Sequence, residues 1–150
     1  MIAIDLPDLA ATAELGARIA RDLAPGDAVA LCGDLGSGKT TLARAVIAAL
    51  GHRGEVPSPT FSIIELYEPP LVRMPVVHAD FYRLAHADEA AGIGLDDYRE
   101  GAALLAEWPE NAGGFAHEPG CLTIRMQTTE KGRRAIVEPG LLWQGRGPWN

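Results

Sequence analysis

Several features that would mark common functions are scarce in this sequence of 150 residues. Only two of its 13 basic residues are lysines, Lys39 and Lys131, and the formal net charge is −7. Tight binding to a nucleic acid backbone needs clustered Lys and Arg. The charge therefore argues against unaided high-affinity binding of nucleic acid, although it leaves a local basic patch open.

Cysteines and long apolar runs are also scarce. Cys32 and Cys121 show no C-x-x-C spacing, so we expect two reduced strand residues in a cytoplasmic protein. No apolar run reaches the roughly 18 residues that a membrane span requires. The N-terminus lacks a basic segment and a long apolar core, so we expect no signal peptide. The composition is ordinary for a globular chain, and we expect one domain over residues 1–140 and a flexible, poorly ordered tail over residues 141–150.

The most informative stretch is residues 28–50. Residues 28–32 form an apolar, partly β-branched run that is typical of a buried parallel strand. A run of good helix formers covers residues 42–50 and stops at Gly51, a residue suited to a helix C-terminus. Between them lies a segment that satisfies G-x-x-x-x-G-K-[ST], namely Gly33-Asp34-Leu35-Gly36-Ser37-Gly38-Lys39-Thr40-Thr41. The order of strand, glycine loop and helix favours a phosphate-binding loop over a glycine-rich turn that caps an ordinary helix.

This loop has the chemistry of a polyphosphate site. Glycines let backbone N–H groups turn toward one point, and the helix N-terminus adds about half a positive charge. We expect Lys39 to face solvent in the free protein and to reach the β- and γ-phosphates of a nucleotide. Thr40 is expected to offer its hydroxyl to Mg²⁺.

A stiff segment follows the loop helix. Pro57 and Pro59 restrict the backbone, so Thr60 can be held in one place. In P-loop NTPases, a threonine after the first helix can sense the γ-phosphate and Mg²⁺. A rigid turn into the next strand explains the segment equally well, and both interpretations stay open.

Two carboxylates stand at the ends of predicted parallel strands. Residues 76–80 end at Asp80, and residues 102–107 end at Glu107. The carboxyl ends of such strands face the crevice where α/β sheets bind ligands. We expect Asp80 to hold Mg²⁺ directly or through its water shell, and Glu107 to contact the metal shell or the attacking water.

Two residues beside these carboxylates have ambiguous roles. Trp108 either lines a nucleotide pocket, contacts a partner or packs in the core. His78 is interpreted as a structural strand residue, because no metal-ligand cluster surrounds it in the sequence.

The rest of the pattern predicts scaffold elements. Residues 121–128 and 133–138 form a predicted antiparallel hairpin that we expect at an edge of the sheet. The other predicted elements are a strand at residues 1–6, a helix ending near residue 23, a strand at 61–67 with a possible hairpin return at 71–74, and short helices at 88–91 and 95–100.

Four local sequences have a specific order and spacing. They are the loop at residues 33–41, Ser58-Pro59-Thr60-Phe61, His78-Ala79-Asp80-Phe81-Tyr82-Arg83-Leu84 and Glu107-Trp108-Pro109. Together they resemble the TsaE family, formerly called YjeE, and the likeness covers residues 9–137. Departures are small, since Ser37 stands where alanine is common and the residues after Gly140 follow no family pattern.

The resemblance implies a fold, a reaction and partners. The fold is an α/β P-loop NTPase with a central parallel sheet, antiparallel edge strands and flanking helices. The implied function is that of an ATPase, with low turnover of its own, that uses ATP and Mg²⁺ and works with TsaD and TsaB. These proteins make threonylcarbamoyladenosine next to the anticodon of tRNAs reading codons that begin with A. The transfer chemistry would belong to TsaD, and tRNA would be met through the complex rather than directly, in the cytoplasm and without a membrane.

The resemblance also assigns roles to residues. It implies catalytic roles for Lys39, Asp80 and Glu107 and a switch-like role for Thr60. We expect Mg²⁺ to be held by Thr40, Asp80 and Glu107. The expected nucleotide contacts are Gly33, Asp34, Leu35, Gly36, Ser37, Gly38, Lys39, Thr40, Thr41, Thr60 and Trp108.

Three other functions share part of this pattern. A small-molecule kinase would need an arginine-bearing lid, and the candidate lid at residues 88–100 contains one arginine, Arg99. A GTPase would need an N-K-x-D segment, which the sequence lacks. A nucleotide-gated binding module with negligible turnover differs from an ATPase only in rate and stays open.

Overall fold

The chain contains both strands and helices in the computed structural model, which describes residues 1–57 and 63–146. The strands are β1 (Ile2–Leu6), β2 (Ala28–Cys32), β3 (Ile64–Tyr67), β4 (Val76–Asp80), β5 (Ala103–Glu107), β6 (Cys121–Thr129) and β7 (Gly132–Pro139). The helices are α1 (Leu9–Asp22), α2 (Lys39–Ala49), α3 (Glu89–Gly92) and α4 (Leu95–Arg99), with short 3₁₀ turns η1 (Pro109–Ala112) and η2 (Trp143–Gly145). None of the helices in these ranges is long and apolar enough to cross a membrane.

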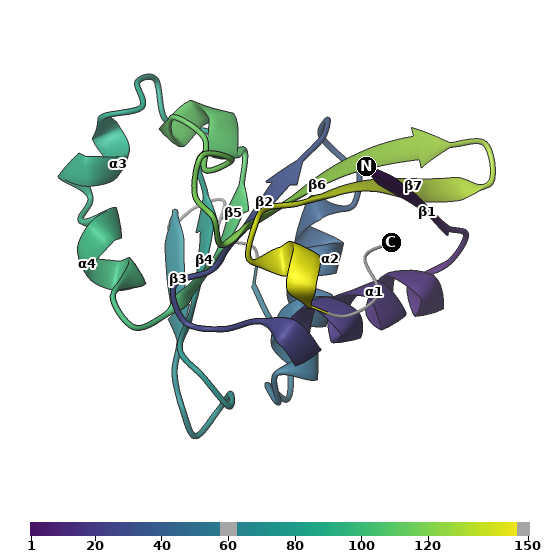
Figure 1. Ribbon diagram of the computed structural model, residues 1–150, viewed down its shortest axis with the longest axis horizontal. Helices are drawn as coiled ribbons and strands as arrows, with labels where there is room; N and C mark the ends of the chain where they lie inside the picture. The colour runs from purple at the N-terminus through teal and green to yellow at the C-terminus, as the bar shows by residue number, and fades with distance from the viewer. Residues whose placement is uncertain (58–62, 147–150) are drawn as a thin grey trace.

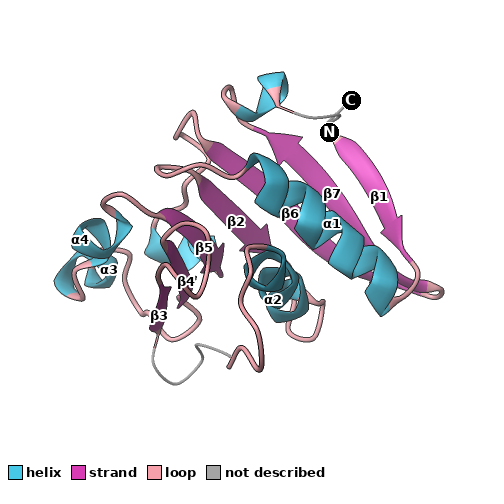
Figure 2. Cartoon of the chain, turned by 90° about the horizontal axis from the view of Figure 1, so that it is seen from below, coloured by secondary structure: helices cyan, strands magenta, loops and turns pink. Residues whose placement is uncertain are grey.

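The strands form one sheet in the order β1-β7-β6-β2-β5-β4-β3 over the described residues. Strands β6, β2, β5 and β4 are mutually parallel, and β1, β7 and β3 pair antiparallel to their neighbours (Figures 1 and 2). The predicted fold class is therefore confirmed. The hairpin return that the sequence suggests from residue 71 is present as the antiparallel pairing of β3 with β4, but the return strand begins only at Val76, because the chain turns over residues 68–74.

The β6–β7 hairpin does not occupy the sheet edge that the sequence suggests. β1 pairs with the outer side of β7, with Ile2 opposite Val137 and Leu6 opposite Arg133. The edge is therefore β1. This pairing joins the first strand of the chain to the last one, so no local sequence pattern predicts it.

The register of the parallel strands assembles the functional edge. Asp80 on β4 lies opposite Glu107 on β5, and Glu107 lies opposite Leu31 on β2. The glycine loop leaves β2 directly after this level, at Gly33. The loop, Glu107 and Asp80 thus follow one another across the carboxyl ends of three neighbouring strands.

Alternating side chains build a core on each face of the sheet. Val29 and Leu31 of β2 pack into the core under α1 and α2, whereas Ala28 and Ala30 face the core that α3 and α4 help to cover. Figure 2 shows α1 and α2 side by side on one face. A Cβ atom built on Gly16 of α1 would lie 2.5 Å from Cβ of Ala45 in α2, so this glycine allows the two helices to pack closely. The packing holds α2, and with it the phosphate-binding loop, against β2.

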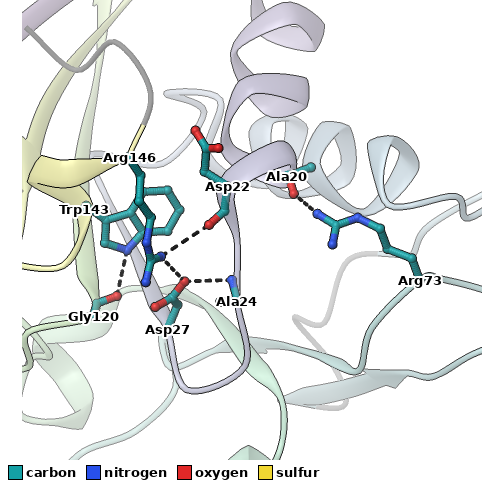
Figure 3. Close-up of polar contacts among 8 residues, drawn as sticks. All are labelled: Ala20, Asp22, Ala24, Asp27, Arg73, Gly120, Trp143 and Arg146. Atoms are coloured by element: carbon teal, nitrogen blue, oxygen red, sulfur yellow. Dashed lines mark hydrogen bonds and ion pairs between the residues drawn. The ribbon is translucent and has the colours of Figure 1, made fainter.

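Residues 140–146, the described part of the segment after β7, are packed against the domain. Trp143 is fully buried, and its indole N–H donates to the carbonyl of Gly120 at 2.8 Å. Arg146 lies over the Trp143 ring and forms an ion pair with the buried carboxylate of Asp27 (Figure 3).

Candidate functional site

The glycine loop joins β2 to α2 with a backbone that only glycine adopts readily. Gly33, Gly36 and Gly38 have φ angles of 138°, 76° and 104°. A Cβ atom on Gly33 would lie 2.6 Å from both Met126 O and Ser37 Oγ, so a side chain does not fit there. Gly38 is the N-cap of α2 and provides no capping side chain. The positive end of the helix dipole is thus open toward an anion.

A cavity of about 290 Å³ lies at this loop. Its lining residues are Leu35, Gly36, Gly38, Lys39, Thr40, Thr41, Asp80, Glu107, Trp108 and Arg133. All of these except Arg133 are predicted site residues. The predicted residues Gly33, Asp34 and Ser37 belong to the loop without lining this cavity, and Thr60 lies outside the described residues.

Lys39 is held at the loop instead of facing solvent as the sequence suggests. Its side chain is 5% exposed, and Nζ donates to the carbonyls of Gly33 at 2.5 Å and Asp34 at 2.9 Å. The ammonium also lies 4.3 Å from the centre of the Trp108 ring. Burial lowers the pKa of Lys39, and the nearby carboxylates of Glu107 and Asp80 oppose this shift. The carbonyl oxygens of Gly33 and Asp34 are neutral, so they are weaker partners for the ammonium than a phosphate oxygen, which forms a charge-assisted hydrogen bond with it.

Glu107 is the centre of a buried hydrogen-bonded group. Thr40 Oγ1 donates to Glu107 Oε1 at 2.6 Å, and His78 Nε2 lies 2.7 Å from Glu107 Oε2. Glu107 is 2% exposed and His78 is fully buried. The sequence interpretation of His78 as merely structural missed this contact. The spacing of His78 and Asp80 contains a clue, because residues two apart on a strand lie on the same face.

Asp80 lies one strand farther from the loop than Glu107. It is 7% exposed, lines the same cavity, and accepts a hydrogen bond from the backbone N–H of Tyr82 at 2.9 Å. The hydroxyl of Thr40 donates to Glu107. The arrangement thus gives the two carboxylates different distances from the loop and leaves room for different roles.

Trp108 has an unusual backbone conformation at the cavity wall. Its φ and ψ angles are 56° and 50°, in the left-handed region that few residues other than glycine adopt. Its ring packs against Tyr82, with ring centres 5.0 Å apart, and covers the Lys39 ammonium. Trp108 is also packed against one core. The tryptophan therefore combines two of the alternatives that the sequence left open, cavity lining and core packing.

The residues at this edge fit a magnesium ion held together with a nucleotide. No group of three His, Cys, Asp or Glu side chains suited to a metal occurs within residues 1–57 and 63–146. Mg²⁺ does not need such a group, since it keeps several waters and takes one or two carboxylates plus substrate phosphates. The Thr40 hydroxyl, Glu107 and Asp80 are oxygen donors of this kind in one cavity.

Comparisons with known proteins agree with this geometry. The sequence model of the family described as "Threonylcarbamoyl adenosine biosynthesis protein TsaE" matches residues 6–136. A Streptomyces coelicolor protein named "tRNA threonylcarbamoyladenosine biosynthesis protein TsaE" is 44% identical over 98 residues, which cover 65% of this chain and 66% of that protein. A Haemophilus influenzae protein of the same name is 41% identical over 91 residues, which cover 60% of this chain and 56% of that protein. The chain thus spans between about half and two thirds of the length of these relatives.

A solved structure has the same fold. The crystal structure of Bacillus subtilis YdiB superposes with a TM-score of 0.73 and 26% sequence identity. The superposition covers 95% of this chain and 87% of that chain, so the likeness includes nearly every described element.

Proposed function

Because this chain belongs to the TsaE family, we propose that it binds and hydrolyses ATP in support of threonylcarbamoyl transfer to the adenosine next to the anticodon of tRNA. The observation that carries the proposal is the 2.6 Å hydrogen bond between Thr40 Oγ1 and Glu107 Oε1. It joins the hydroxyl of a phosphate-binding loop to a buried carboxylate, and an NTPase needs these two groups in contact with one metal and one phosphate chain.

The loop and its lysine form the nucleotide site in this proposal. Backbone N–H groups of residues 33–41 surround the phosphates, and Lys39 exchanges the carbonyls of Gly33 and Asp34 for phosphate oxygens. Trp108 covers Lys39 and keeps water from the ammonium. Thr60 is the proposed sensor of the γ-phosphate, as its position in the sequence suggests.

The two carboxylates have the proposed roles of binding Mg²⁺ and of orienting or deprotonating the attacking water. Bound Mg²⁺ neutralises negative charge on the β- and γ-phosphates. Thr40, Asp80 and Glu107 are the residues that would hold it. Glu107 also orients or deprotonates the attacking water, and His78 fixes the direction of that carboxylate through its other oxygen.

Partners and location follow from the family and the charge. The proposed partners are TsaD and TsaB homologues in the cytoplasm. A net charge of −7 makes this chain a poor ligand for tRNA on its own, so tRNA is reached through the complex. The same partners are proposed to raise a low intrinsic turnover.

The packing disfavours the kinase alternative. Arg99, the single arginine of the candidate lid, donates to both carboxylate oxygens of Glu118 at 2.9 and 2.6 Å and lies over the Phe115 ring. It ties α4 to the loop before β6 and is not presented to the cavity. The segment α3–α4 therefore serves as a cover for the sheet, and a phosphoryl acceptor would find no arginine there.

Replacing Glu107 tests the proposed function. The nearly isosteric Glu107→Gln is expected to keep ATP binding within a small factor of wild type and to lose about a hundredfold or more of the turnover. Binding is measured by titration calorimetry with Mg²⁺, and turnover by phosphate release, each with and without TsaD and TsaB. Glu110→Gln, at an exposed acid three residues away, is the matched control.

Two results would reject the proposal. Wild-type protein that binds neither ATP nor ADP has no nucleotide site. Wild-type protein that binds ATP, does not discriminate against GTP and shows no turnover with partners is a nucleotide-gated binding module instead.

A further inference from the structure

An arginine from the β6–β7 hairpin lies in the phosphate cavity. Arg133 is the second residue of β7, opposite Thr128 on β6 and Leu6 on β1. It is half-buried and lines the cavity together with Gly38, Thr40 and Thr41. It stands almost a hundred residues after the loop in the sequence, so only the sheet register brings the two together.

The guanidinium lies directly against the loop backbone. A Cβ atom built on Gly38 would be 3.0 Å from Arg133 Nη1 and 3.2 Å from Met126 Cε. Gly38 is the N-cap of α2, which is the residue where the helix dipole is most positive. The glycine at this position thus lets the hairpin arginine approach the start of the helix.

The position of Arg133 is restrained by the glycine before it. Gly132 has a φ of 137°, and a Cβ atom there would lie 2.8 Å from Leu6 O and 2.9 Å from Pro7 O. The end of the hairpin is therefore packed onto the end of β1 at its closest possible approach. This packing fixes where the arginine side chain begins.

Cationic and anionic side chains both line the cavity that contains Arg133, since the carboxylates of Asp80 and Glu107 belong to it as well. The Lys39 ammonium, the positive end of α2 and the Arg133 guanidinium line one cavity. Within the described ranges the side chain of Arg133 makes no hydrogen bond or ion pair, whereas that of its neighbour Arg134 pairs with Asp5 at 3.0 Å. A polyphosphate at the N-terminus of α2 would be attracted by both the Lys39 ammonium and the Arg133 guanidinium.

We propose that Arg133 is a phosphate-binding residue, which contacts the polyphosphate of the bound nucleotide from the hairpin side of the cavity. The inference rests on the proposed function and adds a cation that the glycine-loop motif does not contain. The planar guanidinium suits phosphate oxygens, because it offers paired N–H groups in a fixed geometry.

The test compares two adjacent arginines. Arg133→Gln is expected to weaken binding of ATP, and of inorganic tripolyphosphate used as a competitor, by about tenfold to a hundredfold. Arg134→Gln, which removes the same charge one residue away and on the other face of the strand, is expected to bind both ligands like wild type. Circular dichroism melts of both variants establish that the fold is retained.

A measurement on the unaltered protein covers the case in which Arg133→Gln does not fold. Phenylglyoxal modifies accessible arginines, and tripolyphosphate is expected to protect Arg133 but not Arg134, as read by tandem mass spectrometry. Unchanged affinity in folded Arg133→Gln, or labelling of Arg133 that tripolyphosphate does not slow, overturns this inference and leaves the proposed function intact. If the wild-type protein binds neither ATP nor tripolyphosphate, both this inference and the proposed function are rejected.

Discussion

At the scale of single residues, His78 links the core of the sheet to Glu107, the proposed catalytic carboxylate. Its ring is fully buried, and Nε2 contacts Glu107 at 2.7 Å. The other ring nitrogen, Nδ1, is buried without a hydrogen-bond partner among the described residues. Glu107 is therefore the polar group that orients the ring, and the ring in turn orients Glu107.

Changing His78 is expected to affect catalysis more than binding. His78→Gln should lower kcat by about tenfold to a hundredfold, the usual effect of losing a group that orients a metal-binding carboxylate. The KM for ATP should change little, because the loop and Lys39 are untouched. Steady-state phosphate release with partners present separates the two parameters.

The control for this prediction is His52, a partly buried histidine. His52 packs edge-on against Tyr67, and it does not line the phosphate cavity. His52→Gln should leave kcat unchanged. Equal kcat values for wild type and His78→Gln would show that the histidine is only a packing residue.

At the scale of elements, an ion pair between Arg99 and Glu118 ties α4 to the loop before β6. Arg99 at the end of α4 holds Glu118 through two hydrogen bonds, with 17% and 25% of the two side chains exposed. The hydrogen bond from Arg99 lowers the pKa of Glu118 below its ordinary value of 4.5. The stabilisation is thus fully present above pH 4.5 and is lost as the pH falls through the lower value of the folded protein.

Glu118→Gln is expected to destabilise the protein in a pH-dependent way. The free energy of unfolding at pH 7 should fall by about 1–2 kcal/mol, because a partly exposed bidentate pair contributes less than a buried one. The difference between wild type and variant should shrink below pH 4.5, as urea unfolding at several pH values will show. Glu100→Gln, at an exposed acid after the same helix, serves as the control. A pH-independent difference would contradict this account.

The parts of the molecule that sequence predicts are those with local patterns. The glycine loop, the apolar strands and the carboxylates at their ends were identified because each feature is encoded within a few neighbouring residues. Arg133 was missed because it stands beside Arg134 in a strand, where composition does not reveal which of the two faces the loop. Only the pairing of β7 with β1 and β6 decides which arginine faces the loop. The role of Thr60 as a γ-phosphate sensor stays a prediction.

At the scale of the whole molecule, residues 140–146 pack at the end of the sheet opposite the proposed nucleotide site. Arg146 pairs with Asp27, the residue before β2, and the Trp143 indole donates to Gly120, whose carbonyl also accepts from Ala28 N–H at 3.1 Å. The glycine loop leaves β2 at its other end, after Cys32. Stability and nucleotide binding should therefore respond differently to changes in this segment.

Trp143→Ala is expected to lower the free energy of unfolding by about 3–5 kcal/mol, because it removes a large buried ring. ATP affinity of the folded fraction should equal that of wild type. Leu142→Ala, at an adjacent side chain that is 51% exposed, should change neither quantity. Urea unfolding and calorimetry measure the two effects, and a stability loss under about 1 kcal/mol would contradict the proposed packing role.

The pairing of β1 with β7 has a consequence for how the protein is made. The first strand to leave the ribosome, Ile2–Leu6, finds its neighbour only after residue 137 has been added. A nascent chain of about a hundred residues contains the glycine loop, yet it lacks the strand that carries Glu107 and the hairpin that carries Arg133. Sheets closed by such distant partners form late and slowly. We therefore expect that nucleotide binding does not assist the early stages of folding during translation. Chaperones that shield apolar strands are expected to be needed until the final hairpin has emerged.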